Sequence, residues 1–252
     1  MIILNSNLFI DKISLNLNRN KINSFDEYPF NIEIIKDFNE LNFAEPVTFF
    51  IGENGTGKST FLEAIAIAMG LNDEGGTQNF NFVTKNTSSS LSNYLKIFRH
   101  NYPENKFFLR AESFYNFSSE MQRLVEEDHY FSLYKYYGGN LHNCSHGESF
   151  IKLVKNRFGD NGLYILDEPE AALPPERQMT LLCLIDDLVK RGSQFIIVTH
   201  SPILLGIPDA EIFSFDEGEL HLCEYEETDS YIVTELFINN RNHLLHKLLG
   251  EV

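Results

Sequence analysis

Short apolar stretches separated by polar turns run along this sequence and predict an alternation of strands and helices. Residues 47–51 are a continuous apolar run, rich in β-branched and aromatic side chains, that stops at Gly52. Such a run is typical of a buried strand. Residues 60–69 then follow a helical spacing with Ala-rich faces. A further strand is predicted at residues 107–110.

The pattern becomes regular from Ser145 onward. It predicts a helix to about Arg157, a strand at residues 163–166, a helix at 175–190 and a strand at 195–198. Helices that alternate with buried strands favour a parallel α/β core.

The two ends of the chain show shorter signals. Alternation of apolar and polar positions predicts one strand within residues 9–17 and another within residues 30–34. Strand-like segments are also predicted within 211–225 and 231–237, and a last helix over 241–249.

The middle of the chain is less regular. Residues 71–92 are rich in Asn, Gly, Ser and Thr, which favours a surface connection. Residues 118–128 predict an acidic helix. Residues 130–137 are rich in aromatic side chains, which serve for stacking on bases or, more commonly, for core packing or a protein interface. We interpret residues 1–252 as one domain with a helical and loop-rich insertion at about 71–160.

The strongest motif is Gly-Glu-Asn-Gly-Thr-Gly-Lys-Ser at residues 52–59, between a predicted strand and a predicted helix. It fits G-x-x-x-x-G-K-[ST] in the context that this phosphate-binding loop requires, which weighs against a mere glycine-rich turn. The glycines let successive N–H groups point inward, and the helix adds its positive N-terminal end. We expect Lys58 to reach the β- and γ-phosphates and the Ser59 hydroxyl to hold Mg²⁺. The predicted nucleotide-binding residues are Gly52, Asn54, Gly55, Thr56, Gly57, Lys58, Ser59 and Thr60.

Two adjacent carboxylates end the apolar strand at residues 163–166. Ligands sit at the carboxyl ends of strands in an open parallel sheet, so Asp167 is placed to hold Mg²⁺. Glu168 is placed to orient or deprotonate an attacking water. The alternative is a solvated acidic turn, and the upstream phosphate loop weighs against it.

A further segment, Cys-Ser-His-Gly-Glu at residues 144–148, opens a predicted helix. Ser145 and Glu148 have the spacing of a capping box, so these residues are explained in part as a helix cap.

These motifs occur in a particular order: the phosphate loop, the Ser-His-Gly-Glu segment, the apolar Asp-Glu strand and then Val198-Thr199-His200. In this order the chain resembles the nucleotide-binding domain of ABC-type ATPases, nearest to the chromosome-maintenance and break-repair branch. It resembles most closely the small stand-alone ATPases of unassigned role. Those carry segments like Phe-Leu-Arg-Ala-Glu-Ser-Phe at 108–114 and Tyr-Gly-Gly at 137–139. The resemblance spans residues 28–207 and is specific for the ATPase, not for a pathway.

The resemblance implies a fold and a shared site. The fold is α/β: a P-loop NTPase with a mostly parallel core sheet, an antiparallel N-terminal β region and a helical signature region. Ser145 and Gly147 would touch the γ-phosphate held by a second subunit, in a homodimer formed on ATP binding. Lys58, Glu168 and the switch histidine His200 would be the catalytic residues, with ATP and Mg²⁺ bound.

Several positions depart from the family pattern. Glu112 stands where a Gln usually serves the metal, so Ser59, Asp167 and Glu112 are the predicted metal ligands. The cross-subunit aspartate is absent from Ala171-Ala172-Leu173-Pro174. Tyr28 and Phe30 are the candidates for adenine stacking.

Composition restricts the partners. The chain has 252 residues, with 20 Lys and Arg against 36 Asp and Glu, for a formal net charge of −16. This net charge disfavours a broad surface for binding nucleic acid, although it is compatible with a local basic patch. The three cysteines have no metal-ligand spacing, which favours a reducing cytoplasm. No apolar stretch is long enough for membrane insertion, and no signal peptide is evident.

Three functions fit these features. The first is an ATP-hydrolysing conformational switch in nucleic-acid maintenance or defence. The second is the energising subunit of a membrane transporter, which the divergent signature disfavours. The third is a slow nucleotide-binding switch acting on a protein partner, which the presence of Lys58, Asp167, Glu168 and His200 disfavours.

Overall fold

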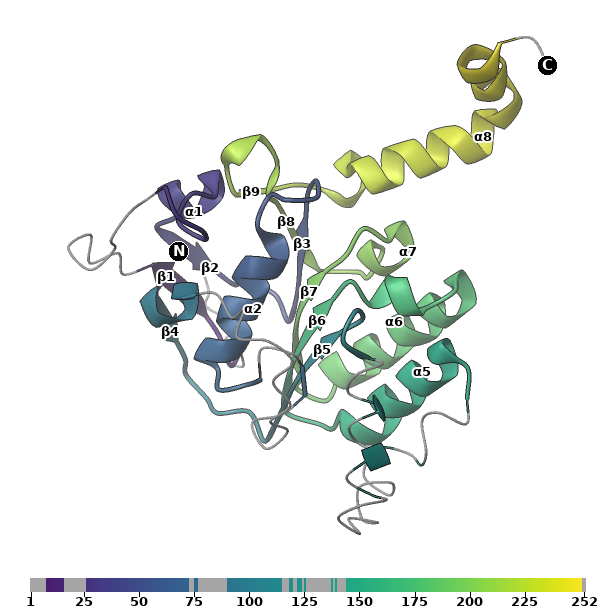
Figure 1. The fold of residues 1–252 in the computed structure, drawn as a ribbon. Helices are drawn as coiled ribbons and strands as arrows, with labels where there is room; N and C mark the ends of the chain where they lie inside the picture. The colour runs from purple at the N-terminus through teal and green to yellow at the C-terminus, as the bar shows by residue number, and fades with distance from the viewer. Residues whose placement is uncertain are drawn as a thin grey trace.

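A six-stranded sheet forms the centre of the computed structural model, and its strand order is β5-β6-β7-β3-β8-β9 (Figure 1). The strands are β3 (Val47–Ile51), β5 (Asn105–Arg110), β6 (Gly162–Asp167), β7 (Gln194–Val198), β8 (Glu211–Ser214) and β9 (His221–Leu222). All neighbours are parallel except β8 and β9. The structure describes residues 8–15, 26–72, 75–76, 90–114, 118–119, 122–123, 125, 137, 139 and 144–250.

The three central strands are apolar because both of their faces are covered. Every residue of β3, β6 and β7 is buried. Helix α2 (Lys58–Ala68) packs on one face, and α5 (His146–Arg157) and α6 (Pro175–Val189) lie on the other (Figure 1). Alternate strand residues therefore enter different cores: Phe50 faces Phe61 of α2, whereas Phe49 lies in the core of α5 and α6. The predicted mostly parallel α/β core is confirmed.

A second, antiparallel sheet consists of β2 (Glu40–Asn42), β1 (Lys12–Leu15) and β4 (Leu95–Phe98), in that order. The buried amide of Gln194, at the start of β7, fixes the segment before β1. Its oxygen accepts hydrogen bonds from the N–H groups of Phe9 and Ile10, both at 2.9 Å, and its nitrogen donates to the Ile10 carbonyl at 3.0 Å. The predicted antiparallel N-terminal β region is confirmed.

One predicted strand, at residues 30–34, is wrong. The chain instead makes turns and then the short helix α1 (Glu33–Asp37). Ile34 and Ile35 are both buried, which an amphipathic strand with alternating faces does not permit but a helix packed on the core does.

The strand predicted at residues 231–237 is also wrong, because it lies inside the long helix α8 (Asp229–Leu249). The Thr228 hydroxyl accepts a hydrogen bond from the Tyr231 N–H at 3.3 Å and so caps this helix. None of the described strands pairs with these residues. The predicted last helix, 241–249, is the final part of α8.

The irregular middle of the chain lies largely outside the described residues. This applies to most of the predicted connection at 71–92, the predicted acidic helix at 118–128 and the aromatic segment at 130–137. Ser90–Tyr94 form a 3₁₀ helix, and the ring of Tyr137 is buried in the core. Among the described helices, none is long and apolar enough to cross a membrane.

A buried carboxylate beside the central sheet makes the stability of the fold depend on pH. Glu211 of β8 accepts hydrogen bonds from the Thr48 hydroxyl at 2.7 Å and from the Ala44 N–H at 3.2 Å. Burial raises the pKa of Glu211 above its ordinary value, although these hydrogen bonds oppose the shift.

We therefore expect the contribution of Glu211 to the free energy of unfolding to fall as the pH rises above the ordinary titration range of a glutamate carboxyl. The folded state binds the Glu211 proton more tightly than the unfolded state, so this contribution is greatest at low pH and is lost above the raised pKa. Urea unfolding of the wild type and Glu211→Gln across this range measures it. The variant should show a shallower dependence on pH, and parallel curves for the two proteins would contradict the assignment.

Candidate functional site

The predicted phosphate loop connects the end of β3 to the start of α2. At two positions of the loop only glycine fits, because the backbone is left-handed and because a Cβ would collide with a neighbouring side chain. Gly52 has φ 134°, and a Cβ there would lie 2.9 Å from Asp216 Oδ1. Gly57 has φ 99°, and a Cβ there would lie 2.9 Å from Ile32 Cγ2. The loop therefore keeps its curl only with glycine at both positions.

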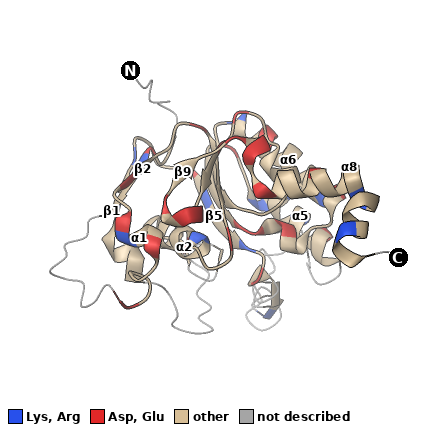
Figure 2. Ribbon diagram, turned by 90° about the horizontal axis from the view of Figure 1, so that it is seen from above, with Lys and Arg blue, Asp and Glu red and all other residues tan. Residues whose placement is uncertain are grey.

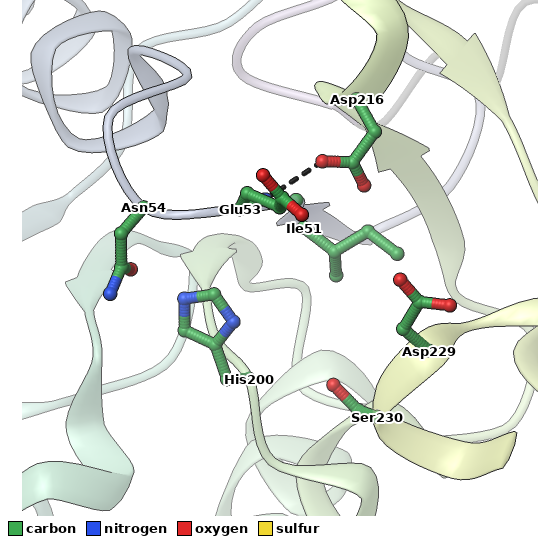
Figure 3. Close-up of a pocket in the computed structure, with 8 residues that line it drawn as sticks. Ile51, Glu53, Asn54, His200, Asp216, Asp229 and Ser230 are labelled. Atoms are coloured by element: carbon green, nitrogen blue, oxygen red, sulfur yellow. Dashed lines mark hydrogen bonds between the residues drawn. The ribbon is translucent and has the colours of Figure 1, made fainter. Parts of the chain in front are cut away.

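The side chain of Lys58 fastens the loop from inside. Its ammonium group donates to the carbonyl oxygens of Gly52 at 2.6 Å and Glu53 at 2.5 Å. Burial lowers the pKa of Lys58, while the carboxylates of Glu168 and Asp216 act to raise it. The Glu53 N–H donates to Asp216 Oδ1 at 2.8 Å, which ties the loop to the segment after β8 (Figure 3).

A chain of polar contacts joins the loop to the end of β6. The Ser59 hydroxyl donates to Asp167 Oδ1 at 3.0 Å, and Arg110 Nε donates to Asp167 Oδ2 at 3.0 Å. Arg110 also contacts Glu63 of α2 at 3.2 Å. Burial alone would lower the pKa of Arg110, but Asp167 and Glu63 together raise it. Asp167 is thus held on both oxygens.

Glu168 follows directly in an unusual backbone conformation. Its φ of 48° and ψ of 52° are left-handed, which costs free energy for a residue with a side chain. Its N–H donates to the Val198 carbonyl at 2.9 Å, so β7 holds it in place. Burial raises the pKa of Glu168, the neighbouring Asp167 raises it further, and His200 lowers it. The site therefore shifts this carboxylate towards its protonated form.

Glu170 positions the histidine segment that follows β7. Its carboxylate accepts from the Thr199 hydroxyl at 2.8 Å and from the His200 N–H at 2.6 Å. The ring of His200 then lies with Nε2 3.9 Å from Glu168 Oε1, too far for a hydrogen bond. No other partner for this nitrogen is found within the described part of the chain.

A cavity of about 410 Å³ adjoins the loop. It is lined by residues 51–54, His200, Asp216 and the first turn of α8, which contributes Asp229 and Ser230. Figure 3 shows His200 between Asn54 on one side and Asp229 on the other. The loop, the histidine segment and the first turn of α8 therefore line the same cavity.

The predicted signature residues lie at the start of α5. The Ser145 hydroxyl accepts from the Glu148 N–H at 3.4 Å, and Glu148 Oε2 accepts from the Ser145 N–H at 3.1 Å. The predicted capping box is confirmed. Gly147 sits against the chain that follows β6, since a Cβ would lie 3.2 Å from Pro174 Cδ.

The remaining predicted residues are two threonines of the phosphate-loop region and the two candidates for adenine stacking. Thr56 donates to the Glu53 carbonyl at 3.0 Å, within the loop, and the Thr60 hydroxyl lies 2.9 Å from the Tyr28 hydroxyl. Phe30 is buried beside Tyr94, with ring centroids 5.1 Å apart, so it is not available for adenine stacking. Of the two stacking candidates, only Tyr28 is exposed.

Glu112 lies exposed in the turn after β5, and the residue that contacts Asp167 from that strand is Arg110. No group of three or more His, Cys, Asp or Glu side chains that could hold a metal occurs among the described residues. The role of Glu112 as a metal ligand stays a prediction. Arg110 and Glu170 were missed by the sequence reasoning, although Arg110 ends a predicted strand at the same edge as Asp167.

Two family models match consecutive parts of the sequence. One, described as an AAA domain, matches residues 21–140, and the other, described as an AAA ATPase domain, matches residues 141–205. The chain is therefore a P-loop ATPase, an ATP-hydrolysing enzyme, as the motifs predicted. No curated protein sequence matches it.

Solved structures with a distant likeness include the SMC head domain from Thermotoga maritima. It is 16% identical with a TM-score of 0.43, and the match covers 86% of this chain and 98% of that one. The cbiO1 protein of Clostridium perfringens, part of the ABC transporter complex cbiONQ, is 18% identical with a TM-score of 0.46. That match covers 94% of this chain and 99% of the other.

Removing the Arg110 side chain should destabilise the fold as well as the site. Arg110→Ala leaves the carboxylates of Asp167 and Glu63 without their cation in a mostly buried position. We expect a loss of about 3 kcal/mol in the free energy of unfolding. Urea denaturation measures it, with Arg191→Ala as control, because Arg191 pairs with Asp160 at the surface. The control should change stability by less than about 1 kcal/mol, and equal losses in both variants would contradict the role of Arg110.

Proposed function

We propose that the chain binds Mg-ATP and hydrolyses it at an interface between two copies, and that this cycle operates a conformational switch of the ABC type. One observation carries the proposal: the hydrogen bond of 3.0 Å between Ser59 of the phosphate loop and Asp167 at the end of β6. It brings the two motifs together, although 108 positions separate them in sequence.

The loop has the chemistry that a triphosphate needs. Backbone N–H groups at the start of α2 and the positive end of that helix attract anions. The Lys58 ammonium group already lies within the curl of the loop, where it donates to two carbonyl oxygens. On binding, it would exchange these acceptors for phosphate oxygens and stabilise the charge that develops on them.

The residues at the end of β6 suit a magnesium ion. Ser59 and Asp167 would hold it, because Mg²⁺ prefers oxygen ligands and takes only one or two from the protein beside phosphate and water. The ion would neutralise charge on the phosphate oxygens. Arg110 and Ser59 fix both oxygens of Asp167 in advance, so little reorganisation is required of this carboxylate. Glu112 is proposed only as a further ligand.

Glu168 is proposed as the general base. Its carboxylate would accept a proton from the attacking water as the new bond to phosphorus forms. The left-handed backbone of Glu168 and the hydrogen bond from its N–H to the Val198 carbonyl orient the carboxylate. His200, held through its N–H by Glu170, would donate a hydrogen bond near the γ-phosphate and help to position the water.

A second copy would supply Ser145 and Gly147. The hydrogen bonds of Ser145 stay within the capping box of its own helix, so α5 presents a capped, positive N-terminus as a preformed unit. Such an end suits the γ-phosphate held by another subunit. The resemblance to ABC-type ATPases supports this head-to-tail arrangement, in which each of two sites uses both chains.

The biological output is proposed from the resemblance alone. A role in nucleic-acid maintenance or defence fits the nearest branch, yet the net charge is −16. Figure 2 shows Lys and Arg scattered among Asp and Glu over the described residues. Stimulation of ATP turnover by DNA or RNA would support the role. The divergent signature weighs against the transporter alternative.

Glu168→Gln should bind Mg-ATP without hydrolysing it, because the amide cannot accept the proton from water. We expect turnover to fall by about a hundredfold or more, and Mg-ATP to change the sedimentation of the variant, from monomer to dimer if the copies start apart or from an open to a more compact dimer if they start joined. Lys58→Ala is the control, since it should lose both turnover and the response to ATP. Absence of any ATP-dependent change in sedimentation, in either size or compactness, would contradict the shared interface.

Ser145 offers a test that separates phosphate contact from helix capping. Asp and Asn both cap helices well, so neither change should weaken α5. Ser145→Asp would place a negative charge against phosphate and should abolish turnover, whereas Ser145→Asn should retain more of it.

Mixing Ser145→Asp with Lys58→Ala chains should restore part of the activity, because one site of the mixed dimer then has an intact loop and an intact signature. Full activity of Ser145→Asp, or no recovery on mixing, would contradict the shared site. Thermal unfolding of each variant checks that the fold is intact.

A further inference from the structure

Helix α8 extends away from the body of the molecule (Figure 1). It has 21 residues, and none of them is buried. Seven of the twelve large apolar side chains that are exposed among the described residues lie on it. They include Ile232, Val233, Leu236 and Phe237 in its first part and Leu248 and Leu249 at its end. Apolar surface concentrated in this way marks an interface.

The base of α8 is nevertheless firmly attached. The ring of Tyr231 packs edge-on against Tyr225, with centroids 4.8 Å apart. The Tyr225 hydroxyl donates to the Pro202 carbonyl of α7 (Pro202–Leu205) at 2.8 Å. The helix is thus presented in a fixed position. Because most helical stability in proteins comes from packing, the apolar residues beyond this base need a partner.

A kink divides α8 into two arms. Asn240 departs from helical geometry with φ −126° and ψ 27°. We call residues 229–239 the first arm and residues 241–249 the second arm. The first arm carries Asp229 and Glu235 but no Lys or Arg, and the second arm carries Arg241 and Lys247 but no acidic residue.

A groove lies beside the first arm. Its volume is about 370 Å³, and it lies between α7 and α8. Ile203, Tyr225, Tyr231 and Ile238 supply apolar lining, and Glu235 also lines the groove. An apolar segment followed or preceded by a positive charge is complementary to this groove. The second arm, with Leu248 and Leu249 beside Lys247, has that character.

We propose that α8 is a dimerisation element, in which the second arm of each copy covers the first arm and groove of the other. Acidic first arms then meet basic second arms on both sides of a two-fold axis, as an isologous interface requires. This contact does not use the phosphate loop and does not need nucleotide, although the first turn of α8 also lines the cavity beside that loop. It would keep two ATPase domains together between rounds of ATP binding.

The charges favour a second copy over other occupants. The chain as a whole carries −16, so two copies repel except where positive charge is concentrated against negative charge. The second arm supplies such a region. Helices that lie on membranes carry Lys and Arg along their polar face, whereas the first arm has only acidic charges.

Sedimentation of the full chain without nucleotide tests the proposal. The wild type should form a dimer, and Phe237→Glu should weaken it by about tenfold or more, because a charge would enter the apolar contact. Met179→Glu is the matched control, since Met179 is 52% exposed on α6 and Phe237 is 41% exposed on α8. Thermal unfolding of each variant shows that it remains folded.

A charge exchange makes the test specific for the pairing of arms. Glu235→Lys alone should oppose like charges across the dimer, and so should the double variant Arg241→Glu, Lys247→Glu. A mixture of the two proteins should dimerise again, because in one pair of arms Arg241 and Lys247 then face an unchanged acidic first arm, and in the other the Arg241→Glu, Lys247→Glu arm faces the Glu235→Lys position. This recovery would not occur if the variants merely damaged α8.

Three outcomes would overturn the proposal: a wild type that stays monomeric without nucleotide, a dimer that resists both sets of variants, or binding of α8 to vesicles of anionic lipid in place of self-association. Because no nucleotide is present, these results are independent of the ATP-dependent interface. If the chain dimerises through α8 but shows no response to ATP, the proposal for α8 stands and the proposed ATP-dependent interface fails.

Discussion

The site depends on one constraint, the parallel register of β6, β7 and β3. Because these strands run in the same direction, their carboxyl ends meet at one edge of the sheet. That edge carries Gly52 after β3, Glu168 after β6 and Thr199 after β7. The hydrogen bond from Ser59 to Asp167 closes the arrangement, since it links the first turn of α2 to the end of β6.

The charged side chains at this edge of the sheet are paired with groups that compensate their charge or accept and donate hydrogen bonds. Asp167 is bonded to Arg110, Glu170 is bonded to the Thr199 hydroxyl and the His200 N–H, and Lys58 lies among several carboxylates. Among the residues that the structure describes, only Glu168 combines a raised pKa with a left-handed backbone. Strain and an unusual pKa at the same residue are typical of a catalytic group, because the surrounding fold must maintain both.

Sequence reasoning succeeded where local chemistry and burial agree. The strand at 47–51, the loop at 52–59 and the capping box at Ser145 were all predicted, because glycines, apolar runs and caps act over a few residues. It failed at 30–34, where alternating apolar and polar positions predicted a strand, and at 231–237, where a strand-like segment was predicted. No described strand pairs with either segment, and the burial of both Ile34 and Ile35 fits a helix packed on the core better than a strand with alternating faces.

The sequence by itself determined that this chain has a phosphate loop and an Asp-Glu strand end, and hence that it is a P-loop ATPase. Only the tertiary structure decided which side chains support them. Arg110 and Glu170 became parts of the site because strands distant in sequence end side by side, and Phe30 was removed from it by burial. Pairings of this kind depend on long-range packing, which no local spacing of residues records.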